Sequence, residues 1–205
     1  MNCLQLSPYQ NVLATGSFDS TVKLWDLLSK SHRAIQTLED FKDSVTCLRV
    51  TETQIIASSV DGLLRVYDMR RGKRLDITIG VAINSFDLGI DPNFVACSCL
   101  DSVVRMIDIS DGTMIAEYKG GHQTVQYHGA VRFNNDSKTI FQASEDNAVT
   151  MYDVATKSIK GKLQGHTMPV ISIDIQGKQS LSIGTDRVVS GSADGTVKIW
   201  RVSRN

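Results

Sequence analysis

Three residue types that a hydrolase could use lie near the end of the sequence. His166, Ser190 and Asp194 could supply the base, the nucleophile and the orienting carboxylate of a Ser-His-Asp triad. However, the surrounding stretch, VVSGSADGTVKIW at 188–200, closely matches VLATGSFDSTVKLW at 12–25. A stretch that occurs twice requires a search for repeats before any catalytic role is assigned.

The same stretch occurs three more times, as IIASSVDGLLRVYD at 55–68, VACSCLDSVVRMID at 95–108 and IFQASEDNAVTMYD at 140–153. Each copy contains an aspartate, and successive aspartates are 40 to 48 residues apart: Asp19, Asp61, Asp101, Asp146 and Asp194. Six residues after each aspartate stands Trp25, Tyr67, Ile107, Tyr152 or Trp200. This spacing predicts a structural unit of about 40–45 residues that is repeated along the chain.

The local pattern of each copy predicts β-hairpins. An apolar or alternating run is followed by a turn with Asp and often Gly or Ser, and then by a β-branched run such as TVKLW. Runs such as VTCLRV at 45–50 and RAIQTL at 33–38 add an inner and an outer strand. Because no helical periodicity persists, we predict an all-β fold whose units each have four antiparallel strands.

Five copies that agree in spacing and residue type, with the Gly165-His166 pair before the last one, resemble the WD-repeat β-propeller family along the whole chain. The resemblance implies a single domain at 1–205 with five blades, at 1–41, 42–80, 81–122, 123–166 and 167–205, the last three-stranded. Met1 falls at the start of an inner strand, and the chain stops at 202–205. Compared with seven-bladed relatives, we therefore expect an open partial ring without N-terminal blades, which self-associates through its open edges.

The resemblance also implies a structural role for the candidate triad. Blades of this family share a buried polar relay of His, Ser or Thr, the turn Asp and Trp, which here is complete in His166, Ser190, Asp194 and Trp200. A buried indole N–H needs an acceptor and a buried carboxylate needs donors, so we interpret the set as structural rather than catalytic. The other blades retain parts of it: Thr15, Asp19 and Trp25; Asp61 and Tyr67; Asp101; Asp146 and Tyr152.

Two details of the relay are specific to this sequence. Cys97 and Ile107 stand at relay positions in the third blade, so we expect its centre to be apolar. Tyr152 has one polar group, its hydroxyl, in place of the tryptophan indole. We expect Tyr152→Phe to destabilise the fold less than Trp200→Phe does.

The residue before each turn aspartate is a candidate for partner binding, because the resemblance places this position on an exposed face. Phe18, Val60 and Leu100 would form an apolar arc there, and Glu145 would follow in the fourth blade. An exposed apolar arc is typical of a protein contact, although these side chains could instead pack into neighbouring loops.

Within the family, QTLEDFKDSVTCLRV, SSVDGLLRVYDMRRGK and the loop HQTVQYHG at 122–129 resemble scaffolds that organise mitogen-activated protein kinase signalling and are associated with splicing complexes. This resemblance implies a non-catalytic scaffold in the cytoplasm and nucleus that binds signalling kinases or spliceosomal components. Residues 55–70 also resemble the box of substrate receptors of cullin-RING ubiquitin ligases. Its functional end would be Tyr67, Asp68 and Arg70, which leaves a ligase receptor as the alternative.

Composition narrows the classes of partner. With 22 basic and 22 acidic residues the chain has no net charge, which gives no electrostatic reason to expect direct binding of nucleic acid or a membrane. No motif predicts a cofactor or metal. The cysteines lack C-x-x-C spacing and are expected to be buried free thiols: Cys3, Cys47, Cys97 and Cys99. The densest basic run, at 69–74, is interpreted as a solvated hairpin tip.

Overall fold

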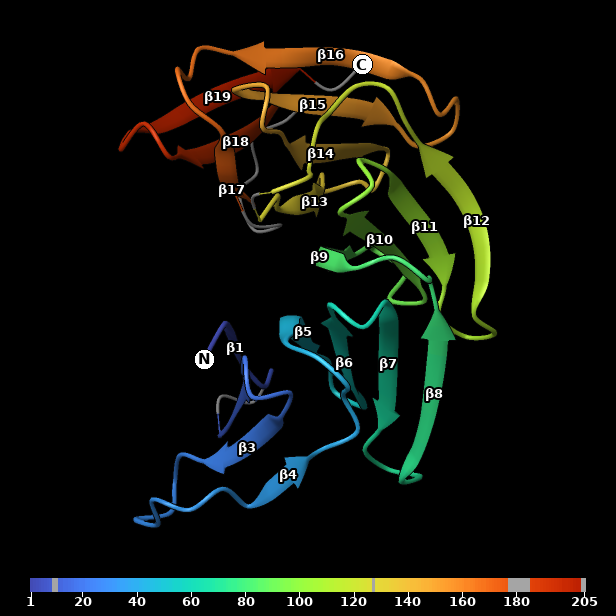
Figure 1. Ribbon diagram of the computed structural model, residues 1–205, viewed down its shortest axis with the longest axis vertical. Coiled ribbons are helices and arrows are strands. Elements are labelled where there is room, and N and C mark those ends of the chain that lie inside the picture. The colour runs from blue at the N-terminus through green and yellow to red at the C-terminus, as the bar shows by residue number, and fades with distance from the viewer. Residues whose placement is uncertain (9–10, 127, 177–184, 204–205) are drawn as a thin grey trace. The chain divides into compact units, whose positions relative to one another are not determined.

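The computed structural model describes residues 1–8, 11–126, 128–176 and 185–203 (Figure 1). These residues form five antiparallel sheets, four of them four-stranded and one three-stranded, which confirms the predicted all-β fold. None of them belongs to a helix that could cross a membrane. Residue 127 of the loop at 122–129 and residues 204–205 at the chain end lie outside the described residues.

The chain divides into two compact units, Met1–Asn84 and Ser85–Asn205. The first unit contains two sheets whose strands pair in chain order, as Figure 1 shows for β5 to β8. One sheet consists of β1 (Cys3–Leu6), β2 (Val12–Gly16), β3 (Val22–Asp26) and β4 (Gln36–Leu38). The other consists of β5 (Val45–Val50), β6 (Gln54–Ser59), β7 (Leu63–Asp68) and β8 (Lys73–Thr78).

The second unit contains the remaining sheets, and the boundary between the units falls within β9. The third sheet consists of β9 (Ile83–Leu88), β10 (Phe94–Cys99), β11 (Val104–Asp108) and β12 (Thr113–Tyr118). The fourth consists of β13 (Val131–Phe133), β14 (Thr139–Ala143), β15 (Ala148–Asp153) and β16 (Ile159–Gln164). The fifth consists of β17 (Val170–Ile175), β18 (Thr185–Ser192) and β19 (Val197–Ser203).

The repeated aspartates lie in the turns between the second and third strands of the sheets. The residue after each aspartate has a φ between 59° and 79°, in the left-handed region: Ser20, Gly62, Ser102, Asn147 and Gly195. Gly and Asn enter this region most easily, and an aspartate carboxylate can hold the turn by accepting an amide hydrogen bond two residues later. Asp19, for example, accepts from the Thr21 amide at 3.1 Å.

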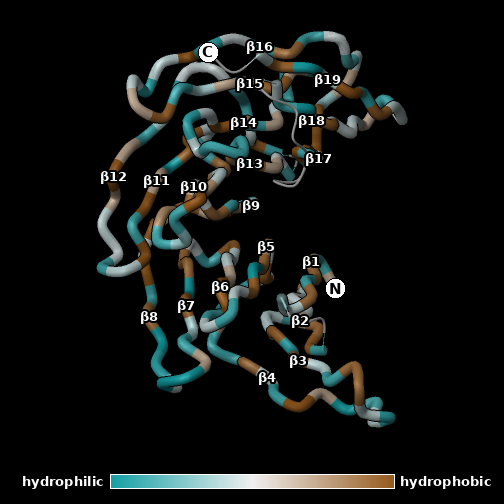
Figure 2. Tube along the Cα trace, turned by 180° about the vertical axis from the view of Figure 1, so that it is seen from behind, coloured by the Kyte–Doolittle hydropathy of each residue, from teal (hydrophilic) through white to brown (hydrophobic). Residues whose placement is uncertain are grey.

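Apolar residues of neighbouring sheets pack face to face within each unit. In the first unit Leu24 of the first sheet and Leu48 of the second belong to one buried cluster. In the second unit consecutive residues of β14 enter different clusters, Ile140 with the third sheet and Phe141 with the fifth. A middle strand such as β10, with the sequence FVACSC, is therefore hydrophobic along most of its length (Figure 2), because both of its faces are buried.

Candidate functional site

The structure joins the four relay residues of the fifth sheet into one chain of hydrogen bonds. The Trp200 indole N–H donates to Ser190 Oγ at 2.8 Å. His166 Nε2 lies 2.8 Å from the same hydroxyl oxygen, and His166 Nδ1 lies 3.0 Å from Asp194 Oδ2. Ser190 lies on β18 and Trp200 on β19, while His166 precedes β17, so the set ties together all three strands.

These contacts have the connectivity of a hydrolase triad, but the serine has no access to a substrate. Ser190 has no exposed surface, and its oxygen is shared by the indole and the imidazole. A nucleophile must reach a reacting carbonyl beside an oxyanion site. The geometry therefore suits a structural role, in which His166 and Ser190 satisfy the polar atoms that the sheet buries.

Asp194 also holds the turn in which it lies. Its Oδ1 accepts from the Thr196 hydroxyl at 2.6 Å and from the Thr196 amide at 2.9 Å, and Oδ2 accepts from the Thr167 amide at 3.0 Å. The Thr196 hydroxyl, followed by these amides and His166, keeps the pKa of Asp194 well below its usual value. The carboxylate thus stays charged and continues to accept from both loops.

The first sheet has only part of the relay. Trp25 donates to Thr15 Oγ1 at 2.9 Å, as the corresponding pair does in the fifth sheet. Asp19 is exposed and bonds within its own turn, where the Thr21 hydroxyl lowers its pKa. Asp19 contacts Ser17 and Thr21 in its own turn, so this aspartate stabilises a turn rather than the sheet interior.

In the fourth sheet Tyr152 stands at the tryptophan position and Gln142 at the serine position, while His122 follows a glycine as His166 does. Tyr152 is fully buried, and its hydroxyl lies 2.6 Å from His122 Nδ1 and accepts from the Gly121 amide at 3.2 Å. Asp146 pairs with Lys162 instead, at 2.5 Å. Among the described residues, His122 Nε2 and Gln142 Oε1 are buried without a hydrogen-bond partner. Burial lowers the pKa of His122 to about 4 and raises that of Tyr152 to about 12.

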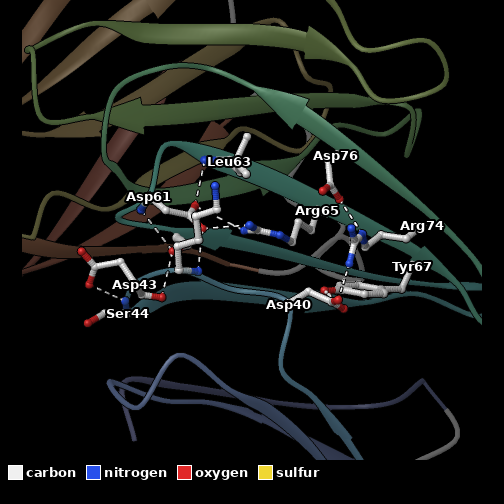
Figure 3. A network of polar contacts seen from close by, with 11 residues as sticks. Asp40, Asp43, Ser44, Asp61, Leu63, Arg65, Tyr67, Arg74 and Asp76 are labelled. Carbon is white, nitrogen blue, oxygen red and sulfur yellow. Dashed lines mark hydrogen bonds and ion pairs between the residues drawn. The ribbon is translucent and has the colours of Figure 1, made fainter.

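The second sheet replaces the relay with a buried ion pair. Arg65 on β7 lies 2.8 Å from Asp61, both side chains are almost fully buried, and the guanidinium lies over the Phe41 ring at 4.5 Å. Figure 3 shows Asp61 accepting from Arg65 and from the Leu63 amide. Tyr67 does not join this pair, because its hydroxyl donates to Asp40 at 3.2 Å.

The third sheet uses the same substitution, with Arg105 and Asp101 2.5 Å apart. Ile107 and Cys97 are buried as the sequence predicts, yet the sheet contains this ion pair beside its apolar residues. Neither arginine is among the residues predicted from the sequence. The available signal was an Arg four residues after the turn aspartate in LLRVYD and VVRMID.

The candidate partner-binding residues differ in exposure. Phe18 is 77% exposed and Val60 is 37% exposed. Ser44 connects the two turns, because its hydroxyl donates to the Phe18 carbonyl at 3.5 Å and its carbonyl accepts from the Val60 amide at 3.0 Å. In the second unit Leu100 is half-buried. Glu145 is half-buried and accepts from the amides of residues 125 and 126. Phe18 and Val60 are therefore an adjacent exposed pair, whereas Glu145 holds a loop.

The residues of the alternative ligase box lie at the end of β7. Tyr67 donates to Asp40, and Asp68 Oδ1 accepts from the amides of Arg70 and Arg71 at 2.9 Å. Of these three residues, only Arg70 has an exposed side chain, and this side chain makes no hydrogen bond or ion pair with the described residues. Of the three box residues, Arg70 is thus the one that is available to a partner.

The cysteines are free thiols, three of them buried and Cys3 partly exposed. Burial raises the pKa of Cys3 to about 12 and that of Cys99 to about 11, so these thiols stay protonated at neutral pH. No three His, Cys, Asp or Glu side chains within the described residues are grouped so that they could hold a metal ion.

Replacement of Trp200 by Phe should lower the free energy of unfolding by about 1–3 kcal/mol, because the indole donor to Ser190 is lost. Sequence alone suggests that Tyr152→Phe costs less. The structure leads us to expect at least as large a loss, since Tyr152 is completely buried and His122 would keep no partner on either nitrogen. Urea denaturation of both variants tests the order, and an unchanged midpoint for Trp200→Phe would contradict the relay.

Replacement of Arg65 by Met should lower the free energy of unfolding by about 3–5 kcal/mol, because the Asp61 carboxylate would be left almost fully buried and unpaired. The matched variant Arg105→Met should cost less, about 1–3 kcal/mol, since Asp101 is about one third exposed and water can replace the guanidinium. Denaturation at one pH compares the two, and equal losses would count against the role of burial.

His122 makes stability depend on pH. Burial holds its pKa in the folded protein below the ordinary histidine value of 6.5, so the folded state binds fewer protons than the unfolded chain. Stability is complete above pH 6.5 and falls as the pH drops toward 4, by a total on the order of 3 kcal/mol. His122→Gln should remove this slope and His32→Gln, at an exposed site, should retain it. A slope that persists in His122→Gln would assign it to other groups.

Comparison with known proteins agrees with the repeat geometry. The chain is 29% identical to the WD repeat domain-containing protein 83 homolog of Dictyostelium discoideum over 226 residues, which cover 97% of this chain and 67% of the relative. It is also 29% identical to WD repeat domain-containing protein 83 of Rattus norvegicus, over 84% of this chain and 52% of the relative. The chain thus spans between half and two thirds of the length of these relatives.

A solved structure supports the fold. The crystal structure of the computationally designed Ika8 protein matches 97% of this chain and 57% of its own chain, with a TM-score of 0.76 and 23% identity. The sequence model of the WD domain, G-beta repeat matches residues 1–26, 33–68 and 157–201, more than half of the 205 residues. The chain belongs to the WD domain, G-beta repeat family.

Proposed function

We propose that this protein is a non-catalytic scaffold that binds other proteins, similar to the WD-repeat scaffolds that organise kinase cascades and are linked to pre-mRNA splicing complexes. Membership of the WD-repeat family and similarity to WD repeat domain-containing protein 83 support this class. The buried Ser190 is out of reach of a substrate, which is consistent with a protein that works by contact rather than by chemistry.

The observation that carries the proposal is the exposed apolar pair Phe18 and Val60. Phe18 exposes 77% of its surface at the turn after β2, and Ser44 connects this turn to the turn after β6. Aromatic anchors that are exposed in the free protein contribute strongly to protein interfaces once a partner buries them. We therefore assign the partner contact in the first unit to these two turns.

The proposed partners are signalling kinases or spliceosomal proteins, and the proposed location is the cytoplasm and nucleus. These finer assignments come from the sequence resemblance to kinase-organising scaffolds. The second candidate function is a substrate receptor of a cullin-RING ubiquitin ligase. It is favoured by the exposed Arg70, which Asp68 positions by holding the main chain of the hairpin.

A double change of Phe18→Ser and Val60→Ser should reduce capture of the partner at least tenfold, because the apolar contact is lost from an already exposed site. The measurement is co-precipitation of the full chain with purified cascade kinases, splicing proteins and, in a separate arm, the ligase adaptor. A control double change of Met114→Ser and Ile115→Ser alters exposed residues of β12.

The arms of this experiment separate the two functions. Capture of the ligase adaptor that depends on Arg70 would favour the receptor. Retained capture of kinase or splicing proteins by a folded Phe18→Ser, Val60→Ser variant would contradict the assigned contact. Circular dichroism and the melting midpoint show whether each variant is folded.

A further inference from the structure

Two cavities in the first unit share part of their lining, and together they are called the groove below. One has a volume of about 290 Å³ and the other of about 370 Å³. Both are lined by Leu24 of β3, Ile55 of β6 and Met69 after β7, so these three residues form the floor where the cavities meet. Each volume is near the lower end of the range of about 300–1,000 Å³ that is typical of binding pockets.

The groove lies away from the turns that contain Phe18 and Val60. The first cavity is lined by Asn11 and Val12 at the start of β2 and by Glu52 just before β6. Phe18 and Val60 follow the opposite ends of these two strands. The groove is therefore a second surface of this unit, distinct from the contact proposed above.

The two cavities differ in polarity. The wall of the first is formed mainly by apolar side chains such as Val12, Ala14 and Ile35, and Ile35 is 58% exposed at its margin. The second is lined by Leu38 and Tyr67 together with charged residues of β8. One end of the groove can thus take apolar side chains, and the other end presents charge.

The second cavity itself has no net charge, because Lys73 and Arg74 are balanced by Asp40 and Asp68 in its lining. Its positive charges differ, however, in whether a carboxylate already pairs with them. Arg74 is paired with both Asp40 and Asp76, as Figure 3 shows, so this cluster has one excess negative charge, and Asp40 also accepts from the Tyr67 hydroxyl. Lys73 lines the cavity, and it has no ion pair among the residues that the structure describes.

Other cations extend this end beyond the cavity. Arg70 and Arg71 follow Met69 in the hairpin tip, both exposed, and Asp68 uses one oxygen to hold their two amides. The other Asp68 oxygen lies 4.0 Å from Arg71, a long contact with a guanidinium that remains 77% exposed. Lys73 and Arg70 therefore have charge to offer to a ligand.

We propose that the groove binds an extended segment of a partner protein in which apolar side chains are followed by acidic residues. The apolar side chains enter the first cavity over Leu24, Ile55 and Met69. The carboxylates face Lys73 and Arg70, which fix the direction of the segment. This site adds a recognition mode to the scaffold and does not depend on which proteins bind at Phe18 and Val60.

The test uses a fluorescein-labelled peptide of Leu and Phe residues followed by Glu residues, and a twin with Lys in place of Glu. Fluorescence anisotropy with the full chain should show that the acidic peptide binds at least about tenfold more tightly than its twin. Added salt should weaken binding of the acidic peptide, because salt screens the attraction between its carboxylates and the exposed cations. Equal binding of the twins, or no binding of either, would overturn the proposal.

Variants locate the binding. The double change Lys73→Glu and Arg70→Glu should lower the affinity for the acidic peptide at least tenfold. The change Ile35→Asp should lower the affinity for both peptides, because it places a carboxylate beside the apolar cavity. Matched changes at exposed sites of the second unit, Arg201→Glu and Ile90→Asp, should leave binding unchanged.

The Phe18→Ser, Val60→Ser variant separates this proposal from the proposed function, since it should retain peptide binding. Loss of peptide binding in this variant, or full binding by the Lys73→Glu, Arg70→Glu variant, would place the peptide elsewhere and contradict the groove. All variants alter exposed side chains, and the melting midpoint confirms that each one is folded.

Discussion

Burial of both faces of the middle strands is the constraint on which the rest of the structure depends. In β14 Ile140 packs toward one neighbouring sheet and Phe141 toward the other, and every residue of the strand is buried. A strand in this environment has no water to satisfy its polar side chains. Each polar group there must find a partner within the protein or carry the cost of desolvation.

The sheets meet this requirement with different chemistry and with residues at different positions of the repeat. The fifth sheet uses Trp200, Ser190 and His166 in a chain of hydrogen bonds. The fourth uses Tyr152 with His122, and the second uses Arg65 with Asp61. In each case a buried polar side chain forms a hydrogen bond or an ion pair with another side chain of the same unit. The repeats therefore share the requirement that buried polar groups are paired, although the residues that meet it differ between sheets.

Because the middle strands are buried, the residues that can contact a partner lie at the ends of the strands. Phe18 and Val60 follow one end of β2 and β6, while the groove begins at the other end of the same strands. These positions do not carry the packing between sheets, so their side chains are free to vary with the partner. This division is consistent with a scaffold that has more than one contact surface in a small unit.

The sequence by itself determined the all-β class, the repeat and the five turns, because these depend on local patterns. Aspartates 40 to 48 residues apart, followed by residues that tolerate a positive φ, mark the turns. It also identified the Trp200, Ser190, His166 and Asp194 set through the resemblance to WD repeats. All four are joined in the structure.

Only the tertiary structure decided which polar groups meet. Arg65 and Arg105 pair with their turn aspartates, Tyr67 turns to Asp40, and Asp19 remains in its own turn. A one-dimensional pattern gives residue type and strand face, but not how deeply a group is buried or which neighbouring loop reaches it. The groove was likewise invisible, since Leu24, Ile55 and Met69 come from segments that only packing brings together.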